Sequence, residues 1–179
     1  MSEQNAPKAS EDIAALLARD EIRSLAYRYA SAIEARDIDA MVALYSPRAR
    51  FGEFGEGPEA LRQLMMTSLE GSLFAVILVA NHLIDIERSD TARGEVWAHC
   101  YAHTRQDGFV EQLIKYEDRY ELHDGRWVFT HRKHRLWYGV EHRDSPLRQP
   151  AANWPASQVG VGDIPLSHDD FRYWWNEWA

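Results

Sequence analysis

The segment Leu113-Ile-Lys-Tyr-Glu-Asp-Arg-Tyr-Glu-Leu-His-Asp-Gly-Arg-Trp-Val128 decides the fold class of this chain. Side chains alternate over Leu113–Leu122, which is typical of a strand with one buried face. The pair Asp124-Gly125 follows, and a further strand-like run extends over residues 126–140. An Asp-Gly pair between two such runs is a strong signal of a β-hairpin. The segment therefore predicts two long antiparallel strands.

Two more strands are expected upstream of this hairpin. Phe74–Ile86 is a long apolar run that ends in charged residues, and residues 94–105 alternate. A charged turn at residues 88–93 and a Gln-Asp-Gly turn at residues 106–108 connect the runs. Four long strands joined by short turns predict an antiparallel meander.

The first part of the chain carries helix signals instead. Apolar residues recur at three- and four-residue intervals from Ile13 to Ile33, which predicts an amphipathic helix. Ser10 is expected to cap this helix, which should end near Ala35. Asp37 is expected to cap a second, short helix that stops before Pro47.

A third helix is expected to start at Pro58 and to end near Ser68, because proline suits the first helical position. Residues 49–54 between the second and third helices have the pattern of a short strand. Helices followed by a strand meander predict an α+β fold, with the helices packed on one face of a curved antiparallel sheet.

The chain is predicted to have three parts. Residues 1–9 are a polar tail, and residues 10–140 form one domain of ordinary size. Residues 141–179 are rich in proline and contain Trp154, Trp174, Trp175 and Trp178. Aromatic residues at this density are expected to be covered. The extension should pack on the domain, cover the mouth of a pocket or contact a neighbouring subunit.

Composition excludes several classes of function. The net charge is −8 without a basic cluster, which disfavours nucleic acid and anionic lipid as partners. Cys100 is the only cysteine, so no internal disulfide is possible, and its small apolar neighbours predict an inert core thiol. No run approaches the roughly 18 apolar residues of a membrane span, and no signal peptide is apparent. We expect a cytoplasmic protein without a nucleotide cofactor, because no phosphate-binding glycine motif is present.

Three stretches resemble the SnoaL-like proteins of the nuclear-transport-factor-2-like superfamily. The first runs from Glu21-Ile-Arg-Ser-Leu-Ala-Tyr-Arg-Tyr to Leu44-Tyr-Ser-Pro47 and resembles their opening helices. The second is Asn81-His-Leu-Ile-Asp-Ile86, and the third is Tyr116-Glu-Asp-Arg-Tyr-Glu-Leu-His-Asp-Gly-Arg-Trp-Val-Phe129 with Arg132 shortly after it. The resemblance covers residues from about 11 to 140 and implies a cone-shaped sheet closed by the helices.

The resemblance implies three catalytic residues. Scytalone dehydratase-like, bile-acid dehydratase-like and dehydrochlorinase members carry a histidine on the strand that holds His82, and it would act as the base. Glu34 takes the place of an aspartate that orients this histidine, and Tyr29 takes the place of a tyrosine that donates to a charged oxygen. Each residue also fits a purely structural role: His82 as a core histidine, Glu34 as an exposed helix-end carboxylate and Tyr29 as a core aromatic residue.

Five further residues are candidate substrate-binding residues. His103 and Tyr101 alternate on one face of a strand, which could line either a pocket or a subunit interface. Tyr116 shares a strand face with Asp118 and Tyr120, and Arg132 shares one with His134. Arg132 would anchor the substrate or a helix carboxylate, or form a structural ion pair with Asp118.

The histidines do not predict a metal site. His99 and His103 lie four residues apart on a strand, which separates them by roughly 13 Å. That is too far for one zinc ion, whose bonds to histidine nitrogen are about 2.0–2.1 Å. His131 and His134 point to opposite faces of their strand.

The resemblance implies a cofactor-independent lyase that acts by acid–base elimination. The substrate would be a hydrophobic aromatic or polycyclic hydroxylated small molecule that loses water or a carbon fragment such as formaldehyde. A ketosteroid-type isomerase and a non-catalytic ligand-binding module are the alternatives, because fold alone does not choose among them. A homo-oligomer is expected, preferably a trimer and otherwise a dimer, formed by packing of sheet faces.

Overall fold

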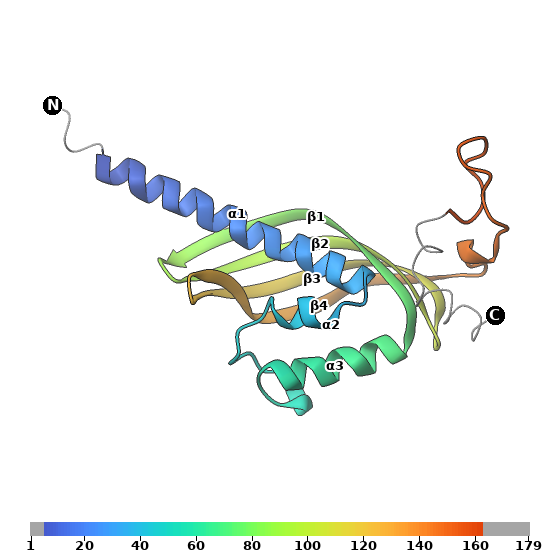
Figure 1. The fold of residues 1–179 in the computed structure, drawn as a ribbon, viewed down its shortest axis with the longest axis horizontal. Coiled ribbons are helices and arrows are strands. Elements are labelled where there is room, and N and C mark those ends of the chain that lie inside the picture. The colour runs from blue at the N-terminus through green and yellow to red at the C-terminus, as the bar shows by residue number, and fades with distance from the viewer. Residues whose placement is uncertain (1–5, 163–179) are drawn as a thin grey trace.

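The helices of the chain lie on one side of a single curved sheet, as the α+β prediction requires (Figure 1). The fold is that of a computed structural model, which describes residues 6–162. Its elements are α1 (Ala6–Glu34), α2 (Ile38–Val42), the 3₁₀ turn η1 (Gly52–Phe54), α3 (Pro58–Glu70), β1 (Ser72–Arg88), β2 (Thr91–Thr104), β3 (Gly108–His123), β4 (Arg126–His142) and the 3₁₀ turn η2 (Pro146–Arg148).

The sheet is an antiparallel meander in the order β1-β2-β3-β4. The β3–β4 hairpin turns at Asp124 and Gly125, whose φ angles are 48° and 75°. Both values lie in the left-handed region, which Asp and Gly tolerate best and which matches the twist of the flanking strands. The predicted hairpin and meander are therefore confirmed.

The three predicted helices are present, but the first one begins earlier than predicted. Asp37 caps α2, since its Oδ1 accepts a hydrogen bond from the Ala40 amide at 2.8 Å, and Pro58 opens α3. The prediction that Ser10 caps the first helix is wrong, because α1 begins at Ala6. Pro7 lies in the first turn, where a missing amide costs nothing.

The strand expected at residues 49–54 is also wrong. Gly52 and Gly55 have φ angles of 59° and 100°, which bend the chain into the η1 turn. A single bridge between Arg50 and Glu56 closes the resulting loop.

An irregularity in β1 changes the face on which its side chains lie. Ala75, Ile77 and Val79 pack against the buried core beneath the helices. Val79 pairs with Ala98 and His82 with Val96, so three residue steps on β1 match two on β2. This β-bulge gives even-numbered residues the inner face beyond it, which places His82 on the same side as the helices.

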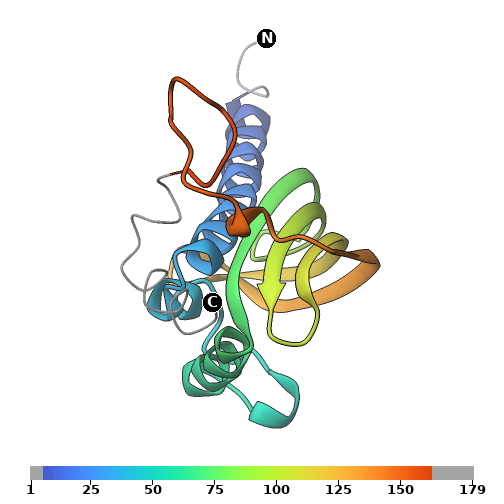
Figure 2. The same ribbon diagram turned by 90° about the vertical axis from the view of Figure 1, so that its right-hand side faces the viewer.

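The core lies between the helices and the inner face of the sheet. The small-residue face of β2 is buried there against Ala26 of α1, as alternation predicted: Val96, Ala98, Cys100 and Ala102. The opposite, outer face carries none of the helices of the described residues (Figure 2). Trp97 and Trp137 meet on that face with ring centroids 5.5 Å apart.

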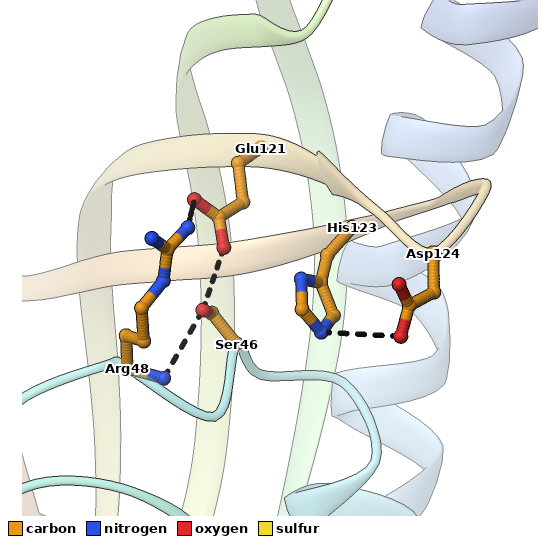
Figure 3. A network of polar contacts seen from close by, with 5 residues as sticks. All are labelled: Ser46, Arg48, Glu121, His123 and Asp124. Atoms are coloured by element: carbon orange, nitrogen blue, oxygen red, sulfur yellow. Dashed lines mark hydrogen bonds and ion pairs between the residues drawn. The ribbon is translucent and has the colours of Figure 1, made fainter.

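A polar clamp fastens the segment after α2 to the end of the sheet (Figure 3). The Ser46 hydroxyl donates to Glu121 Oε1 at 2.7 Å, and Arg48 reaches the second oxygen of the same carboxylate at 3.0 Å. Burial raises the pKa of Glu121, but the bonds from Ser46 and Arg48 outweigh it and lower that pKa. Backbone bonds between this segment and Phe129 complete the attachment. The clamp thereby holds the Tyr45 ring against Phe129.

Residues 143–162 lie beyond the end of the sheet at which β4 ends (Figure 1). The extension was predicted to span residues 141–179 and to be covered or to cover a pocket. Its Trp154 is 66% exposed, and its other three tryptophans lie within residues 163–179, outside the described residues, so this role stays a prediction. No helix among the described residues is long and apolar enough to cross a membrane.

Candidate active site

A buried ion pair lies at the centre of the inner face. Arg132 on β4 and Asp118 on β3 are register partners, and their side chains are 4% and 0% exposed. Nε of Arg132 donates to Oδ1 of Asp118 at 2.9 Å, and Nη2 donates to Oδ2 at 2.7 Å. Burial opposes the charge of Arg132, but the bonds to Asp118 outweigh it and raise the arginine pKa. Two parallel bonds to a carboxylate are the strong, directional form of this interaction.

Three aromatic rings enclose the guanidinium of Arg132. Its Cζ lies 4.4 Å from the Tyr29 ring centroid, 4.2 Å from that of Tyr116 and 4.4 Å from that of Phe129. Planar guanidinium groups favour such stacking. Burial raises the pKa of both Tyr29 and Tyr116, so both phenols stay protonated and can donate hydrogen bonds. The centre therefore combines a cation with two neutral donors.

Tyr120 connects the ion pair to His82. The Tyr120 hydroxyl donates to Asp118 Oδ2 at 2.9 Å and lies 3.0 Å from Nε2 of His82. The other ring nitrogen of His82, Nδ1, is buried without a hydrogen bond to any described residue. Burial lowers the pKa of His82 to about 4, against the opposing effect of Asp118, so the ring is neutral at pH 7. These contacts form one chain of four groups: Arg132, Asp118, Tyr120 and His82.

The carboxylate in this series of hydrogen-bonded groups is Asp118 and not Glu34. Glu34 is exposed at the C-terminal end of α1 and makes no hydrogen bond or ion pair to another described residue. Tyr29, one turn and a half earlier on the same helix, points at Arg132. The supporting role of Glu34 stays a prediction.

The five substrate-binding candidates divide between the two faces of the sheet. Tyr116 and Arg132 lie on the inner face, and His134 joins them through a ring contact with Tyr116 at 5.5 Å. Burial, with Arg132 as a second cause, lowers the pKa of His134. Tyr101 and His103 lie on the outer face, where Tyr101 stacks on Phe109 and His103 contacts Phe74. They do not reach His82 across the sheet.

The outer face holds a second polar group. Glu111 accepts from His99 at 2.8 Å and from His142 at 3.1 Å, and these bonds lower its pKa. Within residues 6–162, no three histidine, cysteine or acidic side chains are arranged to hold a metal ion.

Comparison with known sequences identifies the family of the chain. The sequence pattern of the SnoaL-like domain matches residues 14–133. This span includes all four hydrogen-bonded groups: Arg132, Asp118, Tyr120 and His82. The protein belongs to the SnoaL-like domain family. No curated protein matches it by sequence.

Solved structures share the SnoaL-like fold at low identity. LinA superimposes with a TM-score of 0.69 at 19% identity, over 78% of this chain and 99% of that one. Hexachlorocyclohexane dehydrochlorinase LinA-type3 from Novosphingobium barchaimii gives 0.68 at 18%, over 74% and 94%. A scytalone dehydratase-like protein from Novosphingobium aromaticivorans gives 0.64 at 15%, over 75% and 93%. These similarities establish the cone-shaped architecture.

Tyr120 and Asp118 were not among the residues that the sequence predicted for the site. Alternation on β3 placed both on the face of Tyr116, and the spacing allowed an Asp118–Arg132 pair. Nothing in the sequence joined Tyr120 to His82, because they stand on strands that are not neighbours.

Proposed function

We propose that this SnoaL-like protein is a cofactor-independent lyase. It would eliminate water, or a small carbon fragment such as formaldehyde, from a hydrophobic aromatic or polycyclic hydroxylated molecule. The observation that carries the proposal is the set of hydrogen bonds that runs from the buried Arg132–Asp118 pair through Tyr120 to the half-buried His82. An ion pair in an apolar core is seldom favoured for stability alone, and perturbed titratable groups concentrate at functional sites.

His82 is the proposed base. A general base must be neutral before it accepts a proton, and the low pKa of this ring keeps it neutral. When Nδ1 accepts a proton, Nε2–H can transmit the positive charge through the Tyr120 hydroxyl to Asp118. The carboxylate thus supports the imidazolium through one intervening phenol, which is the role that a directly bonded carboxylate has in a catalytic dyad.

Tyr29 and Tyr116 are the proposed donors to the oxygen that gains charge. Their protonated phenols lie against Arg132, whose charge favours a developing oxyanion. A proton leaves the carbon next to a carbonyl group and binds His82. The freed electron pair forms the double bond, and the departing hydroxyl group takes the proton from His82 and leaves as water. The reaction needs no external oxidant, reductant or cofactor.

Aromatic side chains around the ion pair support an aromatic substrate. Tyr45, Phe51 and Phe129 are packed edge-to-face or tilted against one another on the inner side. Aromatic rings bind flat apolar ligands well, and phenol hydroxyls add a few polar contacts that fix orientation. Dehydrochlorinase and scytalone dehydratase-like names among proteins of the same fold are consistent with elimination chemistry.

A panel of aromatic β-hydroxy ketones and aryl diols tests the proposal. Loss of water or of formaldehyde is followed by mass spectrometry for the wild type and for His82→Ala. The matched control is His131→Ala, which removes an exposed histidine of β4 outside the chain of contacts. We expect His82→Ala to lose at least 100-fold in kcat, the usual contribution of a general base, with the control unchanged. Equal turnover by both variants would refute the assignment of the base.

We also propose that the outer face of the sheet is covered in a homo-oligomer, preferably a trimer. Leu78 and Trp137 are 54% and 71% exposed there, and packing of this face against another subunit would cover both. Light scattering after gel filtration should give a multimer for the wild type and a monomer for Trp137→Glu. Trp154→Glu is the matched control, because Trp154 is exposed outside the sheet. A monomeric wild type contradicts this part of the proposal.

A further inference from the structure

A glycine lies beneath the contact between His82 and Tyr120, the residue that links this histidine to the Arg132–Asp118 ion pair. Gly94 on β2 is the register partner of Ile84 on β1 and of Asp118 on β3. A Cβ atom at this position would lie 3.0 Å from Nε2 of His82 and 3.0 Å from the Tyr120 hydroxyl. It would also lie 3.0 Å from the Leu83 carbonyl oxygen. Ordinary Cβ contacts are longer than this, so any larger residue would have to push these groups apart.

Strand spacing explains why the gap matters. His82 and Tyr120 stand on β1 and β3, which are separated by β2. Neighbouring strands lie about 4.8 Å apart, so these two strands are roughly 10 Å apart. Two side chains can meet across that distance only by leaning over the strand between them. A side chain on the residue beneath the contact would then crowd both groups.

We propose that Gly94 is a positioning residue that allows His82 and Tyr120 to bond, and that this bond fixes the imidazole as a single tautomer. Asp118 accepts from Arg132 and therefore has only acceptor oxygens to offer, so the single Tyr120 proton points to Asp118. The Tyr120 oxygen must then accept from His82, which puts the ring proton on Nε2. Nδ1 is left with its lone pair, which is the form required of the base. The catalytic meaning of this arrangement rests on the proposed function, but the tautomer does not.

Nitrogen NMR of ¹⁵N-histidine-labelled protein tests the tautomer directly. We expect His82 of the wild type to show one protonated nitrogen, Nε2, and one unprotonated nitrogen, Nδ1. Gly94→Ala and Tyr120→Phe should each give an averaged pair of resonances, because both remove the bond that selects the tautomer. Gly139→Ala is the matched control, since among the described residues its new Cβ would meet only Gln112, at 3.8 Å or more. An unchanged His82 spectrum in Gly94→Ala, or an Nδ1–H tautomer in the wild type, overturns the inference.

A stability cycle covers the case in which Gly94→Ala folds poorly. The substitution is made in the wild type and in the His82→Ala/Tyr120→Phe background, where two of the three close contacts are gone. We expect a clearly smaller loss of stability in the second background, because the stability changes caused by substitutions at contacting residues are not additive. Equal losses in both backgrounds would mean that only the Leu83 carbonyl opposes the side chain, and the positioning role would be wrong.

Activity separates this inference from the proposed function. A positioning defect should lower kcat of Gly94→Ala at least tenfold with little change in KM, while Gly139→Ala keeps both. A lost tautomer with full activity would leave the inference intact and remove the proposed base. A retained tautomer with full activity in Gly94→Ala would overturn the inference and leave His82 as the base.

Discussion

Replacing Asp118 with asparagine should destabilise the fold far more than any other acid-to-amide change on β3. Asp118 is fully buried, and its carboxylate accepts both bonds of Arg132 as well as the Tyr120 proton. Asparagine has the same shape but no charge, and its amide group would face a guanidinium that can only donate. Arg132 would then be a buried cation without a counter-charge.

The expected cost follows from the burial of the pair. Breaking a buried ion pair by removing one partner costs about 3–5 kcal/mol, because an uncompensated charge remains in the core. For a domain of this size each kcal/mol lowers Tm by about 2–4 °C, so we expect a drop of about 6–20 °C. Glu117→Gln is the matched control, since Glu117 is the preceding residue on β3 and forms an ion pair with Arg135 at 3.4 Å. That pair is exposed and should be worth about 0–1 kcal/mol.

Urea denaturation followed by circular dichroism, with both variants and the wild type at pH 7, gives the two differences. The double variant Asp118→Leu/Arg132→Met adds a second comparison, because replacing both charges by apolar groups is often neutral for stability. It should recover most of the stability that Asp118→Asn loses. If Asp118→Asn costs no more than Glu117→Gln, the reasoning from burial is refuted.

Three further predictions concern single residues. The pKa of His82 falls from 6.5 to about 4 on folding, so the unfolded chain binds more protons between these values. The stability due to the neutral ring is complete above pH 6.5 and is lost as pH falls toward 4; urea midpoints at pH 7 and pH 5 should therefore differ less in His82→Asn than in the wild type. Burial raises the pKa of Cys100 to about 11, so a thiol reagent at pH 8 should label it only on unfolding, and rapid labelling of the native protein would contradict this. Asp37→Ala should cost about 1 kcal/mol through loss of the α2 cap, and an unchanged melting temperature would contradict that role.

Local signals were sufficient for the sheet and for most helix ends. The turn at Asp124 and Gly125 needs two left-handed residues, and those two types supply them in any context. Asp37 and Pro58 act within one helical turn of their own positions, so their effects can be read from neighbours in sequence. The error at residues 49–54 arose where two glycines bend an otherwise strand-like pattern into a loop.

The sequence predicted which residues of the candidate site share a face of the same strand, but not which residues of different strands are in contact. Alternation identified the shared face of Tyr116, Asp118 and Tyr120, and it also separated Cys100 from Tyr101. It could not supply the contact between Tyr120 and His82, which depends on the register of three strands and on the bulge after Val79. The rotation of α1 that turns Tyr29 inward and leaves Glu34 exposed is likewise set by packing, and helical periodicity alone does not fix it at the last turn.

The phenol between His82 and Asp118 has a consequence for the kind of substrate that the site suits. A carboxylate bonded directly to a histidine raises its pKa, whereas here burial prevails and the pKa falls to about 4. Such a ring is a weak base and a correspondingly strong acid once it has accepted a proton, so it returns that proton readily to a departing hydroxyl group. The first half of the reaction is then the difficult one. We therefore expect the best substrates to carry an acidic C–H bond, as in a carbon placed between a carbonyl group and an aromatic ring, and simple aliphatic alcohols to be inert.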